Sequence, residues 1–263
     1  MRIFLAIALL YFSAIGFIYL FQRKIIFQGT RLARDYRFSF TATEHFIPTP
    51  DGEQINALLF QAKRESKGLI LYFHGNADNL KRWGEYAIDF TTLGFDVLMI
   101  DYRSFGKSSG KAAENTFYAD ATTVYDWIHS QLPQKYDKFV IYGRSLGAAV
   151  ATSLASKVNA DLVILETPFN SFRGAISKAL RPLIFPFPFK NRFNNTERLP
   201  NIKSKIVIFQ GTRDRIVPLS AAKQLKPLLK KGDEFIIIPK GKHKNLRTFE
   251  QFHTKLKEVL SNL

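Results

Sequence analysis

The sequence predicts an α/β fold in which helices flank a mostly parallel central sheet. Two observations support this prediction. Short strand-like runs alternate with longer runs of helical periodicity, which is the pattern of parallel strands joined by helices. The strand-like runs are also continuously apolar, as at residues 69–73 (Leu-Ile-Leu-Tyr-Phe), which is the character of strands buried on both faces. A chain of 263 residues with 46% hydrophobic residues is long enough to bury one such core.

The predicted elements follow one another from residue 54 onwards. The first strand comes after a turn at Asp51-Gly52, and the later strands are short runs rich in Ile, Leu, Val and Phe. The predicted strands are residues 54–60, 69–73, 95–100, 139–142, 162–165, 206–209 and 235–238. The predicted helices are residues 114–132, 146–158, 221–230 with Ser220 as N-cap, and 246–260.

One segment interrupts the alternation of strands and helices. Residues 168–199 contain no clear strand and are rich in Phe, Pro and basic residues. The alternation of Phe and Pro at residues 185–189 excludes a regular helix or a central strand there. We therefore expect a short cap insertion over the carboxyl edge of the sheet, where the active sites of such sheets lie.

The N-terminal segment predicts a transmembrane helix. No residue from Ile3 to Phe21 is charged, and a helix of this length crosses the hydrocarbon core of a bilayer. A cleaved signal peptide would have a shorter apolar run that ends at small residues, whereas the small residues at 13–16 lie mid-run. We therefore expect an uncleaved anchor at residues 1–22, a basic juxtamembrane connector at residues 23–45 and a globular domain at residues 46–263.

The charges bear on partners and on orientation. The net charge is +16, but the basic residues are scattered and no nucleic-acid-binding motif accompanies them, so membrane lipid rather than nucleic acid is the predicted partner. One arginine precedes the apolar run and five basic residues follow it by residue 37, which favours a cytoplasmic globular domain. The absence of cysteine excludes disulfides, thiolate metal sites and a cysteine nucleophile.

The motif G-x-S-x-G occurs twice. The match at residues 143–147 (Gly-Arg-Ser-Leu-Gly) joins a predicted strand directly to a predicted helix, which is the sharp turn that presents a nucleophilic serine. Ser145 would then lie at a helix N-terminus, where free N–H groups favour developing negative charge. The match at residues 106–110 is separated from its strand by several residues, so Ser108 is predicted to be a loop residue.

A serine nucleophile needs a base, which a carboxylate orients. With this turn, the order along the chain is serine, acid, histidine. Of the two histidines after Ser145, His243 follows the last predicted strand, whereas His253 lies inside the last helix. His243 is therefore the predicted base. Asp214, in the loop after the preceding strand, is the predicted acid, and Glu166 at the end of another strand is the alternative.

The transition state of acyl transfer also needs backbone N–H donors for its oxyanion. The residue after the nucleophile supplies one, which here is Leu146. The loop after the strand at residues 69–73 supplies the other, and Asn76 is the candidate. His74, which precedes Gly75 in the same loop, is interpreted as a residue that shapes the loop.

Four spaced motifs make the chain resemble the α/β-hydrolase superfamily. They are residues 73–77 (Phe-His-Gly-Asn-Ala), 101–106 (Asp-Tyr-Arg-Ser-Phe-Gly), 143–147 and 211–214 (Gly-Thr-Arg-Asp). With residues 166–169 (Glu-Thr-Pro-Phe) and the hydrophobic anchor, the chain resembles more narrowly the membrane-anchored abhydrolase-domain branch, which includes depalmitoylases and lysophospholipases. The resemblance covers about residues 45–260. Ser104 and Asp78 replace expected glycines, and lysines flank His243.

The resemblance implies hydrolysis of a carboxylic ester or thioester through an acyl-enzyme, without metal or organic cofactor. Ser145 would attack, His243 would carry the proton and Asp214 would orient His243. Two other functions stay open. A serine peptidase would need a carboxylate cluster to hold the substrate's amino group, and none surrounds the insertion. A non-catalytic, membrane-tethered interaction module is the other alternative.

The insertion and the anchor favour a lipid or acylated substrate at the bilayer. Basic residues of the insertion would dock anionic lipid headgroups. These residues are Arg173, Lys178, Arg181, Lys190 and Arg192. The alternative is that the insertion only packs on the core as the roof of a pocket, since such roofs are usually apolar.

Overall fold

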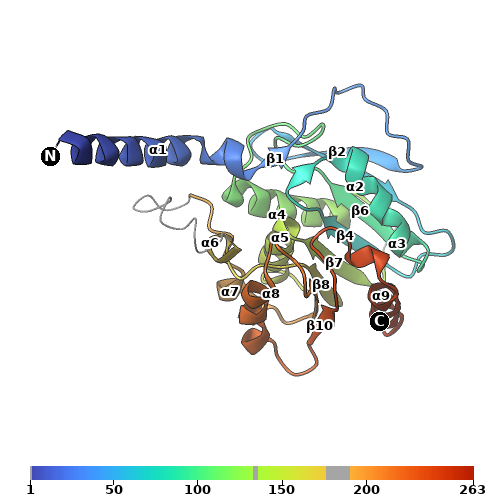
Figure 1. Cartoon of the computed structure of the whole chain (residues 1–263). Helices are drawn as coiled ribbons and strands as arrows, with labels where there is room; N and C mark the ends of the chain where they lie inside the picture. The colour runs from blue at the N-terminus through green and yellow to red at the C-terminus, as the bar shows by residue number, and fades with distance from the viewer. Residues whose placement is uncertain (1, 133–135, 176–189) are drawn as a thin grey trace.

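The centre of the molecule is a twisted sheet whose strands are mostly parallel, as predicted (Figure 1). The computed structural model describes residues 2–132, 136–175 and 190–263, and among these the sheet has eight strands in the order β10-β9-β8-β7-β4-β6-β3-β2. The neighbours from β10 to β6 are parallel, whereas β3 pairs antiparallel with β6 and β2 pairs antiparallel with β3. The strands are β2 (Thr43–Pro48), β3 (Gln54–Phe60), β4 (Leu69–Phe73), β6 (Asp96–Ile100), β7 (Phe139–Arg144), β8 (Leu162–Glu166), β9 (Lys205–Gly211) and β10 (Glu234–Ile238).

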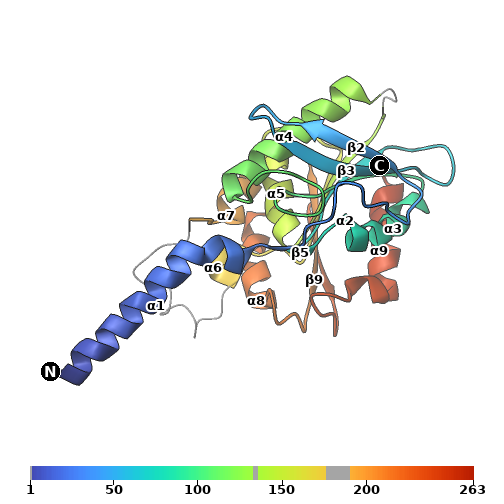
Figure 2. The ribbon, with the colours of Figure 1, turned by 90° about the horizontal axis from the view of Figure 1, so that it is seen from above.

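Helices cover both faces of this sheet. Figures 1 and 2 show α4 (Glu114–Gln131) and α5 (Leu146–Ala155) on one face, and α3 (Ile88–Thr91) and α9 (Glu250–Ser261) on the other. Side chains alternate along each strand, so Leu71 of β4 packs into the core with α4 and α5, whereas Tyr72 packs into the core with α3 and α9. Burial on both faces explains why these strands are continuously apolar.

Three predicted helices have different bounds in the structure. The helix predicted at residues 146–158 ends at Ala155. The helix predicted at residues 221–230 is the single turn α8 (Leu219–Ala222) followed by the 3-10 helix Lys223–Leu228, and its N-cap is Pro218 rather than Ser220. Pro227, which has no backbone N–H and disfavours a continued α-helix, lies within this 3-10 helix. The helix predicted from residue 246 begins as the 3-10 turn Leu246–Thr248 before α9.

Several elements are additional to those predicted. The short helices α2 (Leu80–Trp83), Gly84–Ala87 (a 3-10 helix) and α3 lead from β4 to β6, and β2 forms the edge of the sheet. A second, two-stranded sheet pairs β1 (Gln28–Gly29) with β5 (Ala77–Asp78) in parallel. The segment after β8 contains the short helices α6 (Phe172–Ala175) and α7 (Asn195–Arg198), while the Phe-Pro stretch at residues 185–189, together with Lys178 and Arg181, lies outside the described residues.

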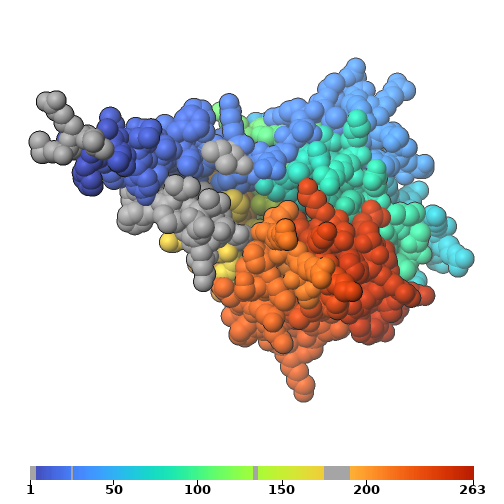
Figure 3. Space-filling model, in the orientation of Figure 1, coloured from blue at the N-terminus to red at the C-terminus, as the bar shows by residue number. Residues whose placement is uncertain are grey.

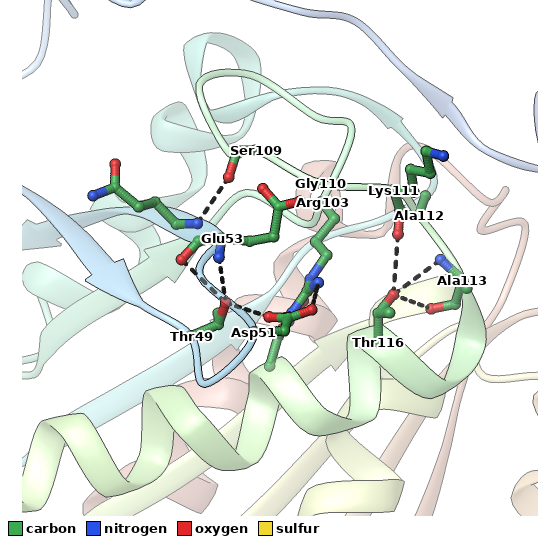
Figure 4. Close-up of polar contacts among 12 residues, drawn as sticks. Thr49, Asp51, Glu53, Arg103, Ser109, Gly110, Lys111, Ala112, Ala113 and Thr116 are labelled. Carbon is green, nitrogen blue, oxygen red and sulfur yellow. Dashed lines mark hydrogen bonds and ion pairs between the residues drawn. The ribbon is translucent and has the colours of Figure 1, made fainter.

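The loop that follows β6 is fixed by a buried arginine. Arg103 pairs with Asp120 of α4 at 2.7 Å and also with Asp51 of the turn between β2 and β3, as Figure 4 shows for Asp51. The hydrogen bonds from Arg103 and Thr49 hold the pKa of Asp51 below its ordinary value, whereas burial raises the pKa of Asp120. This network ties the loop to elements on either side of it, close to the carboxyl ends of the strands.

The N-terminal helix α1 (Arg2–Ile26) projects from the body of the molecule (Figures 1 and 3). Its segment Phe4–Lys24 is long and apolar enough to cross a membrane, and only 6% of its most apolar window is buried within the molecule. Large apolar side chains along it face solvent, for example Phe4 at 75% and Leu10 at 73% exposure. Such a row of exposed apolar side chains is what a membrane, rather than water, would solvate.

Candidate active site

The predicted serine turn joins β7 directly to α5. Ser145 has φ 53° and ψ −111°, a conformation that non-glycine residues rarely adopt and that costs about 1–3 kcal/mol. Gly147 allows the helix to approach the neighbouring strand, because a Cβ there would lie 2.0 Å from the carbonyl oxygen of Phe73. The strained turn places the Ser145 hydroxyl at the carboxyl end of the sheet and at the N-terminus of α5.

The three residues of the predicted triad lie together. His243 Nε2 is 3.0 Å from Ser145 Oγ, and His243 Nδ1 is 2.7 Å from Asp214 Oδ2. Asp214 is completely buried at its side chain, whereas that of His243 is 12% exposed. The histidine is therefore within hydrogen-bond reach of both a nucleophile and an orienting carboxylate, which is the geometry that nucleophilic catalysis by serine requires.

The carboxylate of Asp214 is held in one orientation. Its Oδ1 accepts hydrogen bonds from the backbone N–H groups of Ile216 at 2.9 Å and Val217 at 2.8 Å. Its Oδ2 accepts from Gln210 at 3.3 Å in addition to facing His243. Since both oxygens have donors, the charge is satisfied despite burial.

Glu166, the alternative acid, is engaged elsewhere. It pairs with Arg144 at 3.3 Å and accepts a hydrogen bond from Tyr142 Oη at 2.6 Å. Burial alone would lower the pKa of Arg144, but the nearby carboxylate of Glu166 offsets this effect and the pKa stays above its ordinary value. Arg144 in turn donates to the backbone carbonyl of His243 at 2.9 Å, so this buried pair supports the histidine loop from behind.

The other serine and histidine residues considered as candidates form no hydrogen bond with the triad in the described part of the chain. Ser108 is fully buried, donates to the carbonyl of Asp101 at 2.6 Å and accepts from a backbone N–H. His253 lies exposed on α9. His74 is fully buried and faces Asp101 at 3.2 Å and its own neighbour's carbonyl, Gly75 O, at 2.7 Å. The contacts of His74 are those expected of a residue that shapes the loop.

The two predicted oxyanion donors border the same cleft as Ser145. Leu146 follows Ser145 directly, and Asn76 lies in the loop after β4. Within the described residues, neither backbone N–H donates a hydrogen bond, so both remain available to a substrate oxygen. Two free N–H groups beside a nucleophile are the arrangement that stabilises an oxyanion.

The cleft above Ser145 has a volume of about 330 Å³ and an aromatic and aliphatic wall. Sequence reasoning had assigned no role in the site to several of its lining residues, which lie at variable positions of motifs, between motifs or on the juxtamembrane connector. They are Gln28, Arg82, Trp83, Arg144, Phe169, Phe172, Ile216 and Val217. A signal existed only for Phe169, which belongs to the motif at residues 166–169. Within the described part of the chain, no Asp or Glu lines this cleft.

A second groove, of about 790 Å³, lies on the other side of the histidine and shares Ile216, His243 and Lys244 with the cleft. The loops that carry Asp214 and His243 contribute four exposed basic residues to it, and no ion pair joins them to a described carboxylate. They are Arg213, Arg215, Lys242 and Lys244. The groove also includes the buried carboxylate of Asp214, so four basic side chains and one acidic side chain line it, an excess of positive charge that favours an anionic or neutral group there over a cationic one.

The comparisons with known proteins agree with this fold. A family model described as serine aminopeptidase, S33, matches residues 64–185. The chain is 30% identical over 228 residues to protein bem46 of Schizosaccharomyces pombe, which covers 78% of this chain and 74% of that protein. It is 25% identical over 215 residues to human alpha/beta hydrolase domain-containing protein 17B, covering 81% and 73% of the two chains.

Among solved structures, an esterase of Pyrococcus furiosus superposes with a TM-score of 0.73 at 18% identity, over 90% of this chain and 98% of the esterase. That likeness concerns the fold alone. The identity to bem46 extends over most of both proteins. The chain therefore belongs to the α/β-hydrolase superfamily, in its abhydrolase-domain branch.

Proposed function

We propose that this hydrolase cleaves carboxylic esters or thioesters with Ser145 as nucleophile. The observation that carries the proposal is the hydrogen-bonded series Ser145–His243–Asp214 at the floor of the cleft. Ser145 Oγ attacks the carbonyl carbon while its proton passes to His243 Nε2, and Asp214 stabilises the imidazolium that forms. The carbonyl oxygen becomes an oxyanion that accepts from the N–H groups of Leu146 and Asn76.

The tetrahedral intermediate then collapses to an acyl-enzyme. The bond to the leaving alcohol or thiol breaks, and His243 returns its proton to that group. A water molecule takes the place of the leaving group, gives a proton to His243 and attacks the acyl carbon. Breakdown of this second intermediate releases the carboxylic acid, and the proton returns to Ser145 Oγ. His243 accepts and returns the proton in each half of this cycle.

The electrostatics of the site favour an ester over an amino-terminal peptide, although the matching family model is named for a serine aminopeptidase. An aminopeptidase must hold a cationic amino group, which calls for carboxylates. The described residues that line the cleft include no carboxylate, and of the three cationic residues there Arg82 and Arg144 are ion-paired with Asp78 and Glu166, whereas Lys244 has no ion pair within the described residues. The neighbouring groove adds further positive charge beside His243. The cleft thus offers a free amino group no carboxylate partner, and the exposed basic residues of the groove disfavour a cation beside His243.

An apolar cleft predicts a preference for longer acyl chains. Each methylene that becomes buried contributes about 0.8 kcal/mol, which is about fourfold in kcat/KM. With p-nitrophenyl esters and the full-length protein in detergent, we expect kcat/KM for the octanoate to exceed that for the butyrate by at least about tenfold. Steady-state kinetics over acyl chains of two to sixteen carbons measure this preference.

A control excludes an effect of substrate aggregation. If the cleft determines the preference, p-nitrophenyl octanoate remains the better substrate at concentrations at which both esters are monomeric. A constant or falling kcat/KM with chain length would contradict a lipid or long-acyl substrate. Hydrolysis of an aminoacyl p-nitroanilide in preference to every ester would instead support the peptidase.

We further propose that α1 is retained as a membrane anchor and that the catalytic domain is cytoplasmic. The basic residues that follow α1 support this orientation. In sealed inside-out vesicles, added protease is expected to digest the catalytic domain, and the membrane-extracted protein is expected to have the mass of the uncleaved chain. Digestion in right-side-out vesicles only, or loss of residues 1–22, would overturn the orientation or the anchor, respectively.

A further inference from the structure

We propose that residues 26–32, which connect α1 to the catalytic domain, contribute to catalysis. They hold in position the loop that supplies the second oxyanion donor. We call residues 26–32 the juxtamembrane strap and residues 75–79 the oxyanion loop. The proposal rests on the proposed function, and it makes the side chain of Asn76 a positioning residue for its own backbone N–H.

The first contact joins the end of the membrane helix to the oxyanion loop. The side-chain amide of Asn76 donates to the carbonyl of Ile26, the last residue of α1. The last carbonyls of a helix have no partner within it, so this amide satisfies one of them. Asn76 thus joins the end of α1 to a residue that borders the cleft, and Ile26 itself is only 5% exposed.

The next residues of the strap continue the contact along the loop. Gln28 and Gly29 pair in parallel with Ala77 and Asp78, and Thr30 N–H donates to the carbonyl of Asp78 at 3.2 Å. Asn79 donates to Thr30 Oγ1 at 2.8 Å and to the carbonyl of Thr30 at 3.1 Å. Four consecutive residues of the oxyanion loop are therefore bonded to, or paired with, the strap.

The oxyanion loop needs such support because its backbone is strained. Asp78 has φ 61°, in the left-handed region, at a position where the resemblance to the superfamily implies glycine. A non-glycine residue persists in this conformation only when its surroundings fix it. Pairing of Asp78 with Gly29 and Thr30 supplies that fixation.

The strap is itself clamped from its other side. The N–H of Gly106 donates to the carbonyl of Thr30 at 2.8 Å, and the N–H of Leu32 donates to the carbonyl of Gly106 at 3.0 Å. Arg31 donates to the carbonyl of Gly110 at 3.1 Å. Gly29 lies so close to Phe105 that a Cβ would be 2.4 Å from its ring. The strap therefore lies between two loops at the carboxyl edge of the sheet and is not a free linker.

The strap also joins α1 to the cleft without a flexible interval. Phe27 N–H still donates to the carbonyl of Arg23, as in a continued helix, and Gln28 lines the cleft. Two extended residues span at most about 7 Å, so the cleft opens close to the end of the membrane helix. The cleft that would bind the acyl group and the helix α1 that would enter the bilayer are thus joined by the hydrogen-bonded strap.

The test removes side-chain contacts between the strap and the oxyanion loop and leaves the backbone N–H of Asn76 in place. Asn76→Leu removes the amide and keeps the approximate size of the side chain, and Thr30→Val removes an acceptor on the strap. The matched controls are Asn201→Leu, whose amide donates to a main-chain carbonyl outside the cleft lining, and Thr92→Val, an exposed threonine that bonds the preceding helical turn. All four variants are made in the full-length protein and assayed in detergent with p-nitrophenyl octanoate.

A displaced oxyanion donor lowers kcat and leaves ground-state binding in place. Loss of one donor costs about 10²–10³-fold in kcat, so for Asn76→Leu we expect a fall of about 10–100-fold with KM changed less than about threefold. The affinity for octylboronic acid, which forms a tetrahedral adduct with the serine, is expected to fall by the same factor as kcat. Competitive inhibition by octanoate is expected to stay unchanged, as are all values for the controls. A merely structural contact would not separate these two inhibitors.

Amide hydrogen exchange of the oxyanion loop gives a readout independent of activity. Exchange at residues 75–79 is expected to be faster in Asn76→Leu and in Thr30→Val than in the controls, measured at a temperature well below the thermal midpoint of every variant. Unchanged exchange together with unchanged kcat overturns the role of the strap. If the wild-type chain hydrolyses no ester but exchange still accelerates, the proposed hydrolase function fails while the hold of the strap on the loop stands.

Discussion

Replacing Ser145 with alanine is expected to lower kcat/KM for acyl esters by about 10⁴–10⁶-fold and to abolish labelling by a fluorophosphonate. The variant lacks the oxygen that attacks the carbonyl, whereas the cleft and the two N–H donors remain. Any residual rate then comes from binding and oxyanion stabilisation alone. Rates are measured with p-nitrophenyl octanoate, and labelling is followed by gel fluorescence and by mass spectrometry of the labelled peptide.

The chain provides its own control for this variant in the serine of the second G-x-S-x-G motif. Ser108→Ala is expected to remain labelled at Ser145 and to lose about 1–3 kcal/mol of stability, because a buried N–H and a buried carbonyl lose their hydroxyl partner. Labelling that persists in Ser145→Ala, or that maps to Ser108 in the wild-type chain, would contradict the assignment of the nucleophile.

The sheet was predictable because its central strands have a recognisable local sequence pattern. Each central strand is a short apolar run between turn-forming residues, so its place along the chain could be read without knowledge of its partners. The two-residue strands β1 and β5 have no such pattern, and each forms only because the other lies beside it. Residues 26–32 consequently resembled a basic connector, although the structure packs Ile26 and Phe27 into the core.

The candidate site was predictable where chemistry is tied to strand ends. Ser145, Asp214 and His243 each follow a strand, and parallel strands bring their carboxyl ends to one edge of the sheet. Arg144 carried no such signal, because it occupies a variable position of its motif and its importance lies in long-range contacts with Glu166 and the carbonyl of His243. For the same reason, the sequence left two carboxylates as candidate acids.

Asp214→Asn and Glu166→Gln are expected to separate those two carboxylates, with the first lowering kcat by about 10⁴-fold. The physical reason lies in the contacts of Asp214. Two backbone N–H groups face Oδ1, so the oxygen of the new amide remains there and its NH₂ group faces His243 Nδ1. Nδ1 must then accept a hydrogen bond, which leaves the proton on Nε2. In that tautomer His243 cannot accept the proton of Ser145.

Glu166→Gln also replaces a carboxylate with an amide of the same shape, but we expect it to lower stability rather than kcat. The buried guanidinium of Arg144 loses its counter-charge, and breaking a buried ion pair from one side costs about 3–5 kcal/mol. We expect a lower thermal midpoint, with kcat per labelled active site within about threefold of wild type, because Ser145, His243 and Asp214 keep their mutual contacts. Counting active sites with a fluorophosphonate corrects both variants for unfolded protein. A kcat that collapses in Glu166→Gln and survives in Asp214→Asn, each per active site, would reverse the assignment of the acid, since only the carboxylate that orients His243 sets the tautomer on which proton transfer depends.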